Sequence, residues 1–313
     1  MRVYLVNRIL ATVPVMMVVP VFVFSLLRLT PGDPAAVIAG DYANPKDVLQ
    51  IRQKLGLDEP LYRQFGIWMS QLLRGGLGTS IFSGVPVTQL ITQRLEPTLV
   101  LTLLTLIIAI GLAIPLGTLA AWNVGTWIDR GVMIFAVRGC SLPVFWLAFL
   151  LIYAFAMPLS MLPVQGYAHL SQGLLPCLKH LILPALTLGL VYTALIARMT
   201  RASMLEVLQE DYIRTASAEG ARAWSVVTRH ALKNVALPVV TVIGVGVALL
   251  IGGAVVTESV FALPGLGRPT VEAILHRDYP VIQGMIAVVS AVCVMVNLLI
   301  DLAYAFLDPR IRY

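Results

Sequence analysis

The sequence has little charge. Asp, Glu, Lys and Arg supply only 12% of its 313 residues and 58% are hydrophobic, whereas soluble domains use about 25% charged residues. The mean hydropathy is correspondingly high, at +0.87. Too few polar side chains are present to cover a water-facing surface. The composition therefore excludes an ordinary soluble domain and predicts an integral membrane protein.

Cysteine is also scarce. Cys140, Cys177 and Cys293 are too few and too far apart for a disulfide framework or a CxxC metal site, so we read them as small apolar residues. The formal net charge is +6, but the basic residues are scattered and form no basic tract with interleaved aromatics. This pattern argues against a nucleic-acid partner.

Signatures of enzymes are missing as well. The sequence contains no HExxH, no GxSxG and no GxxxxGK[ST] phosphate loop. Its dispersed histidines predict no metal cluster; they are His169, His180, His230 and His276. We therefore expect no catalytic residue, no metal and no cofactor bound by this chain. Energy for any work against a gradient must come from elsewhere.

Long apolar runs dominate what is present. A helix needs about 20 apolar residues to cross about 30 Å of hydrocarbon, and several segments come near that length. We predict six spans, at Ile9–Leu27, Thr98–Ala121, Ser141–Ser160, Leu181–Ala197, Val235–Thr257 and Ile282–Leu307. The first is longer than a signal-peptide core and lacks an A-x-A site before "RLTPGDP", so we read it as a retained span.

Lys and Arg decide the orientation of these spans, because short cytoplasmic loops carry an excess of both. With the N-terminus inside, the inside segments hold Arg2, Arg8, Arg130, Arg138, Arg198, Arg201, Arg214, Arg222, Arg229, Lys233, Arg310 and Arg312. The short outside loops hold only Lys179, Arg268 and Arg277. The distribution predicts that both termini are cytoplasmic.

This topology makes residues 28–97 one long external segment. Within it, "IRQKLGLDEPLYRQFGIWMSQLL" has helix-like apolar spacing at Leu55, Leu61, Phe65, Trp68 and Leu72. Two interpretations stay open: a docking surface for an external partner, or helices that lie on the membrane surface or cap the bundle.

Ionisable residues are nearly absent from the middle of the spans, where ion-coupled carriers and proton pumps usually need them. Asp301 lies near the inner end of the sixth span and Glu258 just past the outer end of the fifth, so we read both as interfacial anchors in preference to a coupling role. Small residues recur in the fifth span at Gly244, Ala248 and Gly252, and close helix packing explains them about as well as a translocation path does.

A polar, cationic segment interrupts the apolar pattern between the fourth and fifth spans, at about residues 198–235. It reads as helix up to Gly220, where glycine can stop a helix because it reaches left-handed backbone angles without a Cβ clash. After the stop, Trp224, Val227 and Ala231 fall on one apolar face. The polar residues around them are Arg222, Arg229, His230 and Lys233. The pattern predicts two short helices, the second suited to a partner's groove or to an anionic lipid surface.

Ten stretches over nearly the whole chain are specific in their combined order and spacing. They are "LTPGDP" (Leu29–Pro34), "LGLDEPLYRQF" (Leu55–Phe65), "GGLGTS" (Gly75–Ser80), "LPVFWLAFLL" (Leu142–Leu151), "LPVQGY" (Leu162–Tyr167), "ARMTRASMLEVLQEDYIRTASAEG" (Ala197–Gly220), "RHALKNVALPVVT" (Arg229–Thr241), "PGLGR" (Pro264–Arg268), "RDYPVIQ" (Arg277–Gln283) and "DPRIRY" (Asp308–Tyr313). Together they resemble the binding-protein-dependent ABC importer permeases, with the EAA-type coupling loop in the cytoplasm. The dipeptide/oligopeptide/nickel/glutathione branch is the most similar.

The loop departs from the general pattern of that family. A Glu-Ala-Ala triplet precedes the glycine by six residues there, whereas this sequence has Arg214, Thr215 and Ala216, with Gly220 retained. Lys233 stands where the pattern has a proline. This substitution is usual in the peptide/nickel branch, and the contacts of the motif's glutamate do not carry over.

The resemblance implies an all-α membrane protein with six transmembrane helices, both termini in the cytoplasm, and one permease domain over residues 1–313. Such a chain is half of a pore in the bacterial cytoplasmic (inner) membrane and is not itself an enzyme. Its implied partners are a second homologous permease subunit, two cytoplasmic ATPase subunits that bind ATP and Mg, an extracytoplasmic solute-binding protein, and membrane lipid.

The resemblance also implies which residues couple transport to the ATPases: Arg214, Ala216, Gly220, Arg222, Trp224, Val227 and Arg229. Closure of the ATPases on ATP is expected to pull the helix after Gly220. Trp224 and Val227 are expected to seat in the ATPase groove, while the arginines set its register. The external loop Thr257–Pro280 is read either as a gate or docking surface or, at its Pro and Gly residues, as plain turns.

A di- or oligopeptide is the first expectation for the substrate, with nickel chelates or glutathione as alternatives. Two other classes of protein remain open. One is a gradient-driven transporter or channel, which the scarcity of mid-membrane charge disfavours. The other is a structural or assembly membrane protein whose inside helix binds a scaffold. Co-purification of an ATPase would separate both from the importer.

Overall fold

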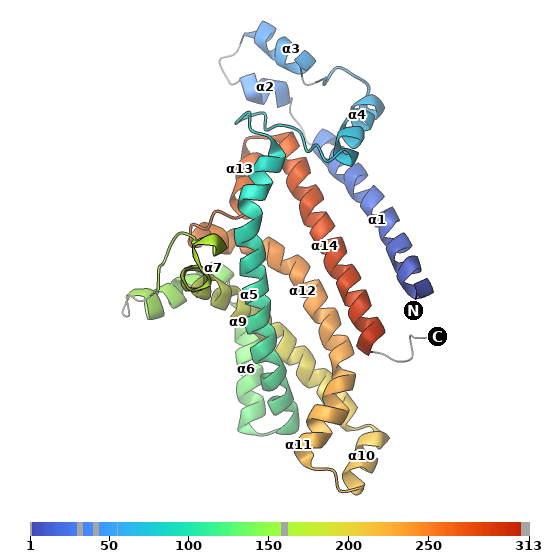
Figure 1. Ribbon diagram of the computed structural model, residues 1–313. Helices are drawn as coiled ribbons and strands as arrows, with labels where there is room; N and C mark the ends of the chain where they lie inside the picture. Colours follow the sequence, from blue (N-terminus) through green and yellow to red (C-terminus); the bar gives the residue numbers. More distant parts are fainter. Residues whose placement is uncertain (1, 30–33, 40–43, 55, 158–161, 308–313) are drawn as a thin grey trace. The chain divides into compact units, whose positions relative to one another are not determined.

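The computed structural model describes residues 2–29, 34–39, 44–54, 56–157 and 162–307. Within these ranges the chain is almost entirely helical, and the one pairing of extended backbone is an isolated antiparallel bridge between Thr79 and Pro86. The prediction of an all-α protein is confirmed for this part of the chain (Figure 1).

The α-helices are α1 (Arg2–Leu29), α2 (Pro34–Ala39), α3 (Pro45–Lys54), α4 (Leu61–Leu73), α5 (Val87–Trp122), α6 (Trp127–Ser141), α7 (Val144–Leu151), α9 (Leu174–Leu208), α10 (Asp211–Ala218), α11 (Ala223–Ser225), α12 (Leu232–Val260), α13 (Gly267–Leu275) and α14 (Tyr279–Leu307). The π-helical segments η1 (Ile152–Ala156) and η3 (Val226–Ala231) and the 3-10 turn η2 (Leu170–Gln172) lie between them.

These helices belong to two compact units. Unit 1 comprises residues 1–5, 97–264 and 296–313, and unit 2 comprises residues 6–96 and 265–295. Because α1, α5 and α14 each contribute residues to both units, neither unit is a separate stretch of the chain.

Helix α9 is the centre of unit 1. Of its most apolar stretch, 67% is buried, and α6, α7 and α12 pack against it. Glycines occupy the closest crossings: a Cβ at Gly139 would lie 2.7 Å from the Ala194 Cβ, and one at Gly246 would lie 2.8 Å from the Tyr192 ring. Side-chain atoms cannot approach so closely, so α6 and α12 need glycine where they cross α9.

Unit 2 has a smaller apolar core of its own. Val87, Ile91 and Met285 are buried there, together with residues of α1 and α13. The Gly284 position in α14 has room only for a hydrogen, since a Cβ would lie 2.6 Å from Val87 Cγ1.

The amphipathic stretch predicted in the external segment forms α3 and α4, which belong to unit 2. Phe65 and Trp68 of α4 pack against Phe24 of α1, with ring centroids 5.3 and 6.0 Å from that of Phe24. Leu61 is 59% exposed, and Leu55 lies outside the described residues. Phe65 and Trp68 therefore pack against α1, and both interpretations of the external segment stay predictions.

Four of the six predicted spans are long apolar helices. They are α5, α9, the continuous segment Ala223–Val260 and α14. The first predicted span falls in α1. The described apolar stretch of this helix, Leu10–Ser25, is shorter than the predicted span. The membrane-spanning character of the chain is clear, while the count of six and the orientation stay predictions.

The third predicted span, Ser141–Ser160, is separated from α6 by a break in the helix. α6 ends at Ser141, and α7 with η1 follows at 111° to it, so that the bent pair is a fifth candidate span when taken together. Pro143 explains the break, because it has no amide hydrogen and favours an extended residue before it. Leu142 accordingly has φ −81° and ψ 131°.

Candidate functional site

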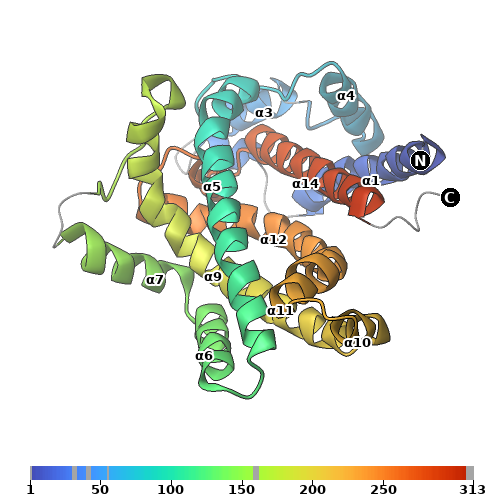
Figure 2. The same ribbon diagram turned by 60° about the horizontal axis from the view of Figure 1, so that its bottom comes forward.

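The polar segment between α9 and α12 lies at one end of unit 1. Figure 1 shows α10 and α11 beside the ends of α9 and α12, and Figure 2 turns this end forward. The turn between α5 and α6 lies toward the same end. η3 contacts α9, α10 and α12. The segment is thus held by the two long helices that it joins.

Gly220 ends α10, as the sequence predicts. Its φ is +86°, and its N–H donates to the Ser217 carbonyl at 3.1 Å while the Ala221 N–H donates to the Ala216 carbonyl at 3.1 Å. These are the two bonds of a Schellman motif. Nothing lies within 4 Å of the place that a Cβ would take. The backbone angle, and not the space, therefore favours glycine here.

A second break, before α10, was not predicted. α9 ends at Leu208, Glu210 has an extended backbone with ψ 145°, and α10 begins at Asp211. No glycine or proline marks this position, so the sequence pattern has no signal for it. The stretch expected to be one helix up to Gly220 is therefore two helices.

Trp224 is the most exposed large apolar side chain of the segment, at 74%. Val227 and Ala231, by contrast, are buried in the core of unit 1, with exposures of 5% and 0%. The three residues therefore do not form one exposed apolar surface. Trp224 lies in α11, ahead of the π-helical segment Val226–Ala231, whereas Val227 and Ala231 lie within that segment and pack in the core. Val227 holds the segment to unit 1 and offers little surface to a partner.

Further contacts anchor the segment from both sides of Gly220. Ile213 of α10 and Val226 of η3 are buried at 4% and 3% in the same core. Asn234 Nδ2 donates to the Tyr212 hydroxyl at 2.6 Å, which joins α12 to α10. Burial of one such apolar side chain stabilises by about 1.5–3 kcal/mol. The segment is therefore firmly attached to unit 1.

The outer surface of the segment is cationic. Arg214, Arg222 and Arg229 are exposed, and Ala216 is half-buried. Arg214 Nη1 lies 3.4 Å from Asp211 Oδ1, but both side chains are largely in solvent, so the pair contributes little. An exposed tryptophan among exposed arginines is the kind of surface that binds another protein, since Trp and Arg are enriched in interface hot spots.

An ion pair that sequence analysis missed ties α9 to the start of α6. Arg201 Nε and Nη2 donate to the two Asp129 carboxylate oxygens at 2.5 and 2.8 Å, and the Gly125 N–H donates to Asp129 Oδ2 at 3.0 Å. Asp129 is only 5% exposed. The partners are 72 residues apart, and the one sequence signal is an acidic residue in an otherwise basic inside loop.

Glu258 is an internal hydrogen-bond acceptor. Its side chain is fully buried in unit 1 and accepts a hydrogen bond from Thr98 Oγ1 at 2.6 Å, which joins α12 to α5. The helix continues past this residue to Val260, and the role of Glu258 as an interfacial anchor stays a prediction. Asp301 of α14 is also buried, at 9% exposure.

The loop predicted as a gate or a set of turns begins inside unit 1. Phe261 and Leu263 are each 1% exposed, and the Gly166 N–H donates to the Phe261 carbonyl at 3.2 Å. Ala262 between them has φ +50°, which is uncommon for a residue with a Cβ. Part of the remainder forms α13, so the loop is more than a series of turns.

No group of three or more potential metal ligands occurs among the described residues. His180 Nδ1 and His276 Nδ1 each contact a backbone carbonyl four residues earlier, at 2.9 and 2.8 Å. These contacts give both histidines a local structural explanation.

Comparison with known proteins extends these observations to the whole chain. The model of the family described as "Binding-protein-dependent transport system inner membrane component" matches residues 113–313. A second model, "Binding-prot-dependent transport system membrane comp, N-term", matches residues 1–102. The two matches together cover nearly all of the sequence.

Three curated relatives match over almost their full length. The "Probable peptide ABC transporter permease protein y4tP" of Sinorhizobium fredii is 52% identical, with 100% of both chains covered. The "Dipeptide transport system permease protein DppB" of Alkalihalophilus pseudofirmus is 40% identical, again with 100% of both covered. The "Glutathione transport system permease protein GsiC" of Escherichia coli is 43% identical, with 99% of both covered.

A solved structure is similar in fold. The chain in "Inward facing conformations of the MetNI methionine ABC transporter" superposes with a TM-score of 0.58 at 18% identity, covering 71% of this chain and 97% of that one. At this identity the likeness concerns the fold alone.

Proposed function

The chain belongs to the family of binding-protein-dependent transport system inner membrane components, and we propose that it is a permease subunit that carries di- or oligopeptides across the bacterial inner membrane. Peptide and dipeptide permeases that are 40–52% identical over their whole length support this substrate class. The glutathione permease, at 43% identity, keeps that small peptide as the second candidate. A nickel chelate remains a third.

The observation that carries the coupling proposal is the exposure of Trp224 on a segment whose other large apolar side chains mostly pack against unit 1. A soluble ATPase subunit with an apolar groove would bind this side chain, and Arg222 and Arg229 would meet acidic groups at the rim. Arg214, on the other side of Gly220, extends the same cationic surface. Gly220 sets the angle between the two short helices.

The anchoring explains how a movement of the ATPases would reach the membrane. η3 packs against α9, α10 and α12 and runs directly into α12 without a linker. A displacement of the segment is then passed to two long helices of unit 1. We propose that two such ATPase subunits bind ATP and Mg and that this chain makes no contact with the nucleotide.

A second permease subunit would cover part of α12. Val245, Leu249 and Val256 are 61%, 59% and 42% exposed, and Ala248 and Gly252 between them are exposed as well. Gly244, which the sequence places with these small residues, instead lies against Ile300 of α14. An apolar face with small residues suits close packing with another helix. Six spans with cytoplasmic termini, and a solute-binding protein outside, complete the proposal.

The test is the ATPase activity of the purified complex in lipid, with and without binding proteins loaded with dipeptide, glutathione or nickel chelate. We expect a dipeptide-loaded partner to stimulate hydrolysis. If no ATPase co-purifies and no loaded partner stimulates hydrolysis, the importer function fails.

Two substitutions test the coupling site in the same assay. Trp224→Asp is expected to lower stimulated hydrolysis and uptake at least about tenfold, because a tryptophan hot spot is worth about 2 kcal/mol or more. Gly220→Pro should do the same, because proline cannot adopt φ +86°. Trp224→Phe is a control that keeps an apolar aromatic ring. Thr228→Asp is a control that adds the charge at an exposed position of the same segment. Normal uptake by both Trp224→Asp and Gly220→Pro would refute the coupling role.

A further inference from the structure

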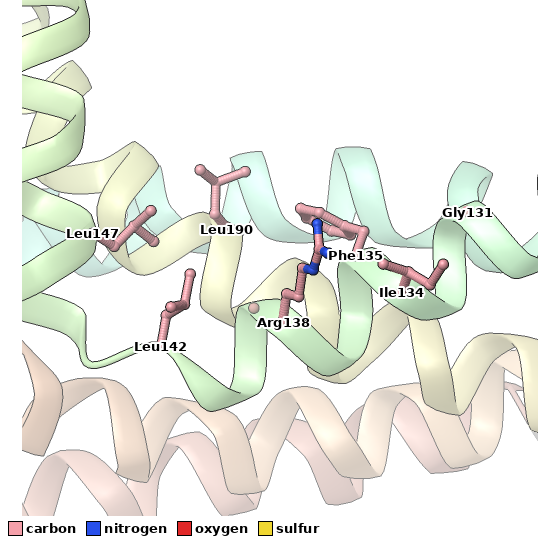
Figure 3. A pocket seen from close by; sticks show the side chains of 8 residues that line it. Gly131, Ile134, Phe135, Arg138, Leu142, Leu147 and Leu190 are labelled. Carbon is pink, nitrogen blue, oxygen red and sulfur yellow. The ribbon is translucent and has the colours of Figure 1, made fainter.

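A pocket of about 330 Å³ opens where α6, α7 and α9 meet in unit 1. Its walls are two glycines and five apolar side chains, those of Ile134, Phe135, Leu142, Leu147 and Leu190. Arg138 supplies the one charged group among the residues that line it. Figure 3 shows the guanidinium beside the ring of Phe135 and on the same side as Leu190. The pocket thus combines one cation with an otherwise apolar surface.

The cation of this pocket lacks a counterion within the described part of the chain. No described carboxylate pairs with Arg138, whereas Arg201 is paired with Asp129 at 2.8 Å. Arg130, on the same helix as Arg138, has its guanidinium 5.3 Å from the centre of the Trp127 ring. Arg138 therefore needs an anion from outside the protein or contact with water.

The surface around the pocket is apolar, and Arg138 is itself exposed beside it. α6 and α7 expose large apolar side chains in unit 1, among them Trp127 at 83%, Ile134 at 52%, Val137 at 57%, Phe145 at 49% and Phe149 at 58%. Such a surface is covered by hydrocarbon or by another protein. An exposed cation beside such a surface lies where an anionic lipid head group can pair with it.

We propose that this pocket binds one phospholipid with an anionic head group. A phosphate accepts two parallel hydrogen bonds from a guanidinium, and an acyl chain fills the apolar walls. Arg138 also falls in an inside segment of the predicted topology, and the cytoplasmic leaflet is where anionic lipids gather. A free peptide fits less well, because its ammonium group would be desolvated beside a cation. The proposal is independent of which solute the protein transports.

The test is native mass spectrometry of the intact complex, titrated with phosphatidylglycerol or phosphatidylcholine that carry the same acyl chains. We expect one phosphatidylglycerol per copy of this chain to be retained, and phosphatidylcholine to be lost. Arg138→Gln should weaken phosphatidylglycerol retention at least about tenfold, as expected when a charge-assisted pair is removed. Arg130→Gln is the matched control, because it removes the same charge from the same helix outside the pocket.

A second variant keeps the charge and removes the space. Leu147→Trp is expected to fill the pocket and to displace the lipid while Arg138 stays intact. If Arg138→Gln fails to assemble, Leu147→Trp provides the test instead. Equal retention of phosphatidylglycerol by the wild type and the variants would overturn the proposal. Equal retention of the two lipids by the wild type would do the same. Loss of a second permease subunit from Arg138→Gln, with lipid retention unchanged, would identify that subunit as the occupant instead.

Discussion

The ion pair between Asp129 and Arg201 permits a quantitative prediction about the end of unit 1 that carries the polar segment. Removing one member of a buried pair costs about 3–5 kcal/mol, because the other charge stays buried without its partner. The Asp129 side chain is 7% exposed but that of Arg201 is 22% exposed, so water compensates in part. We therefore expect Asp129→Asn and Arg201→Gln each to lower the free energy of unfolding by about 2 kcal/mol.

The double variant separates the pair from its individual residues. Asp129→Asn with Arg201→Gln should lose less stability than the sum of the single losses, by about 0.5–3 kcal/mol, because no unpaired charge is left. The assay is reversible unfolding of the chain in mixed micelles, with Arg214→Gln as a control for an exposed pair that should cost less than about 0.5 kcal/mol. Losses below that value for both single variants, or strictly additive losses, would refute the reasoning.

Two further predictions concern helix packing and the loop of unit 2. Gly117→Ala should destabilise the chain by about 1–3 kcal/mol, because its Cβ would lie 2.6 Å from a backbone oxygen of α9. Gly111→Ala on the same helix has nothing within 4 Å and should be neutral or stabilising; equal effects of the two would contradict the packing. Asp278→Ala should raise hydrogen exchange of the Ile81 and Phe82 amides, since it removes the carboxylate that accepts their hydrogen bonds at 3.1 and 3.4 Å. Exchange unchanged relative to the exposed control Asp58→Ala would count against these hydrogen bonds.

Much of the fold could be predicted because it depends on local physics. A run of about 20 apolar residues can satisfy its backbone groups in a membrane only as a helix, so α5, α9, α12 and α14 follow from the sequence alone. Gly220 could be assigned as a helix stop for a similar reason, since only glycine adopts a positive φ without cost. The order and spacing of the motifs likewise indicated the family, because both are properties of the linear sequence.

What the sequence could not decide are the contacts between segments far apart in the chain. Trp224 and Val227 are both apolar residues of one short segment, and only the packing of that segment against the core of unit 1 buries Val227 while Trp224 stays exposed. The pairing of Asp129 with Arg201 and the pocket around Arg138 likewise depend on where α6 crosses α9. Local propensity determines which residues are helical, whereas packing between helices determines which face each one buries.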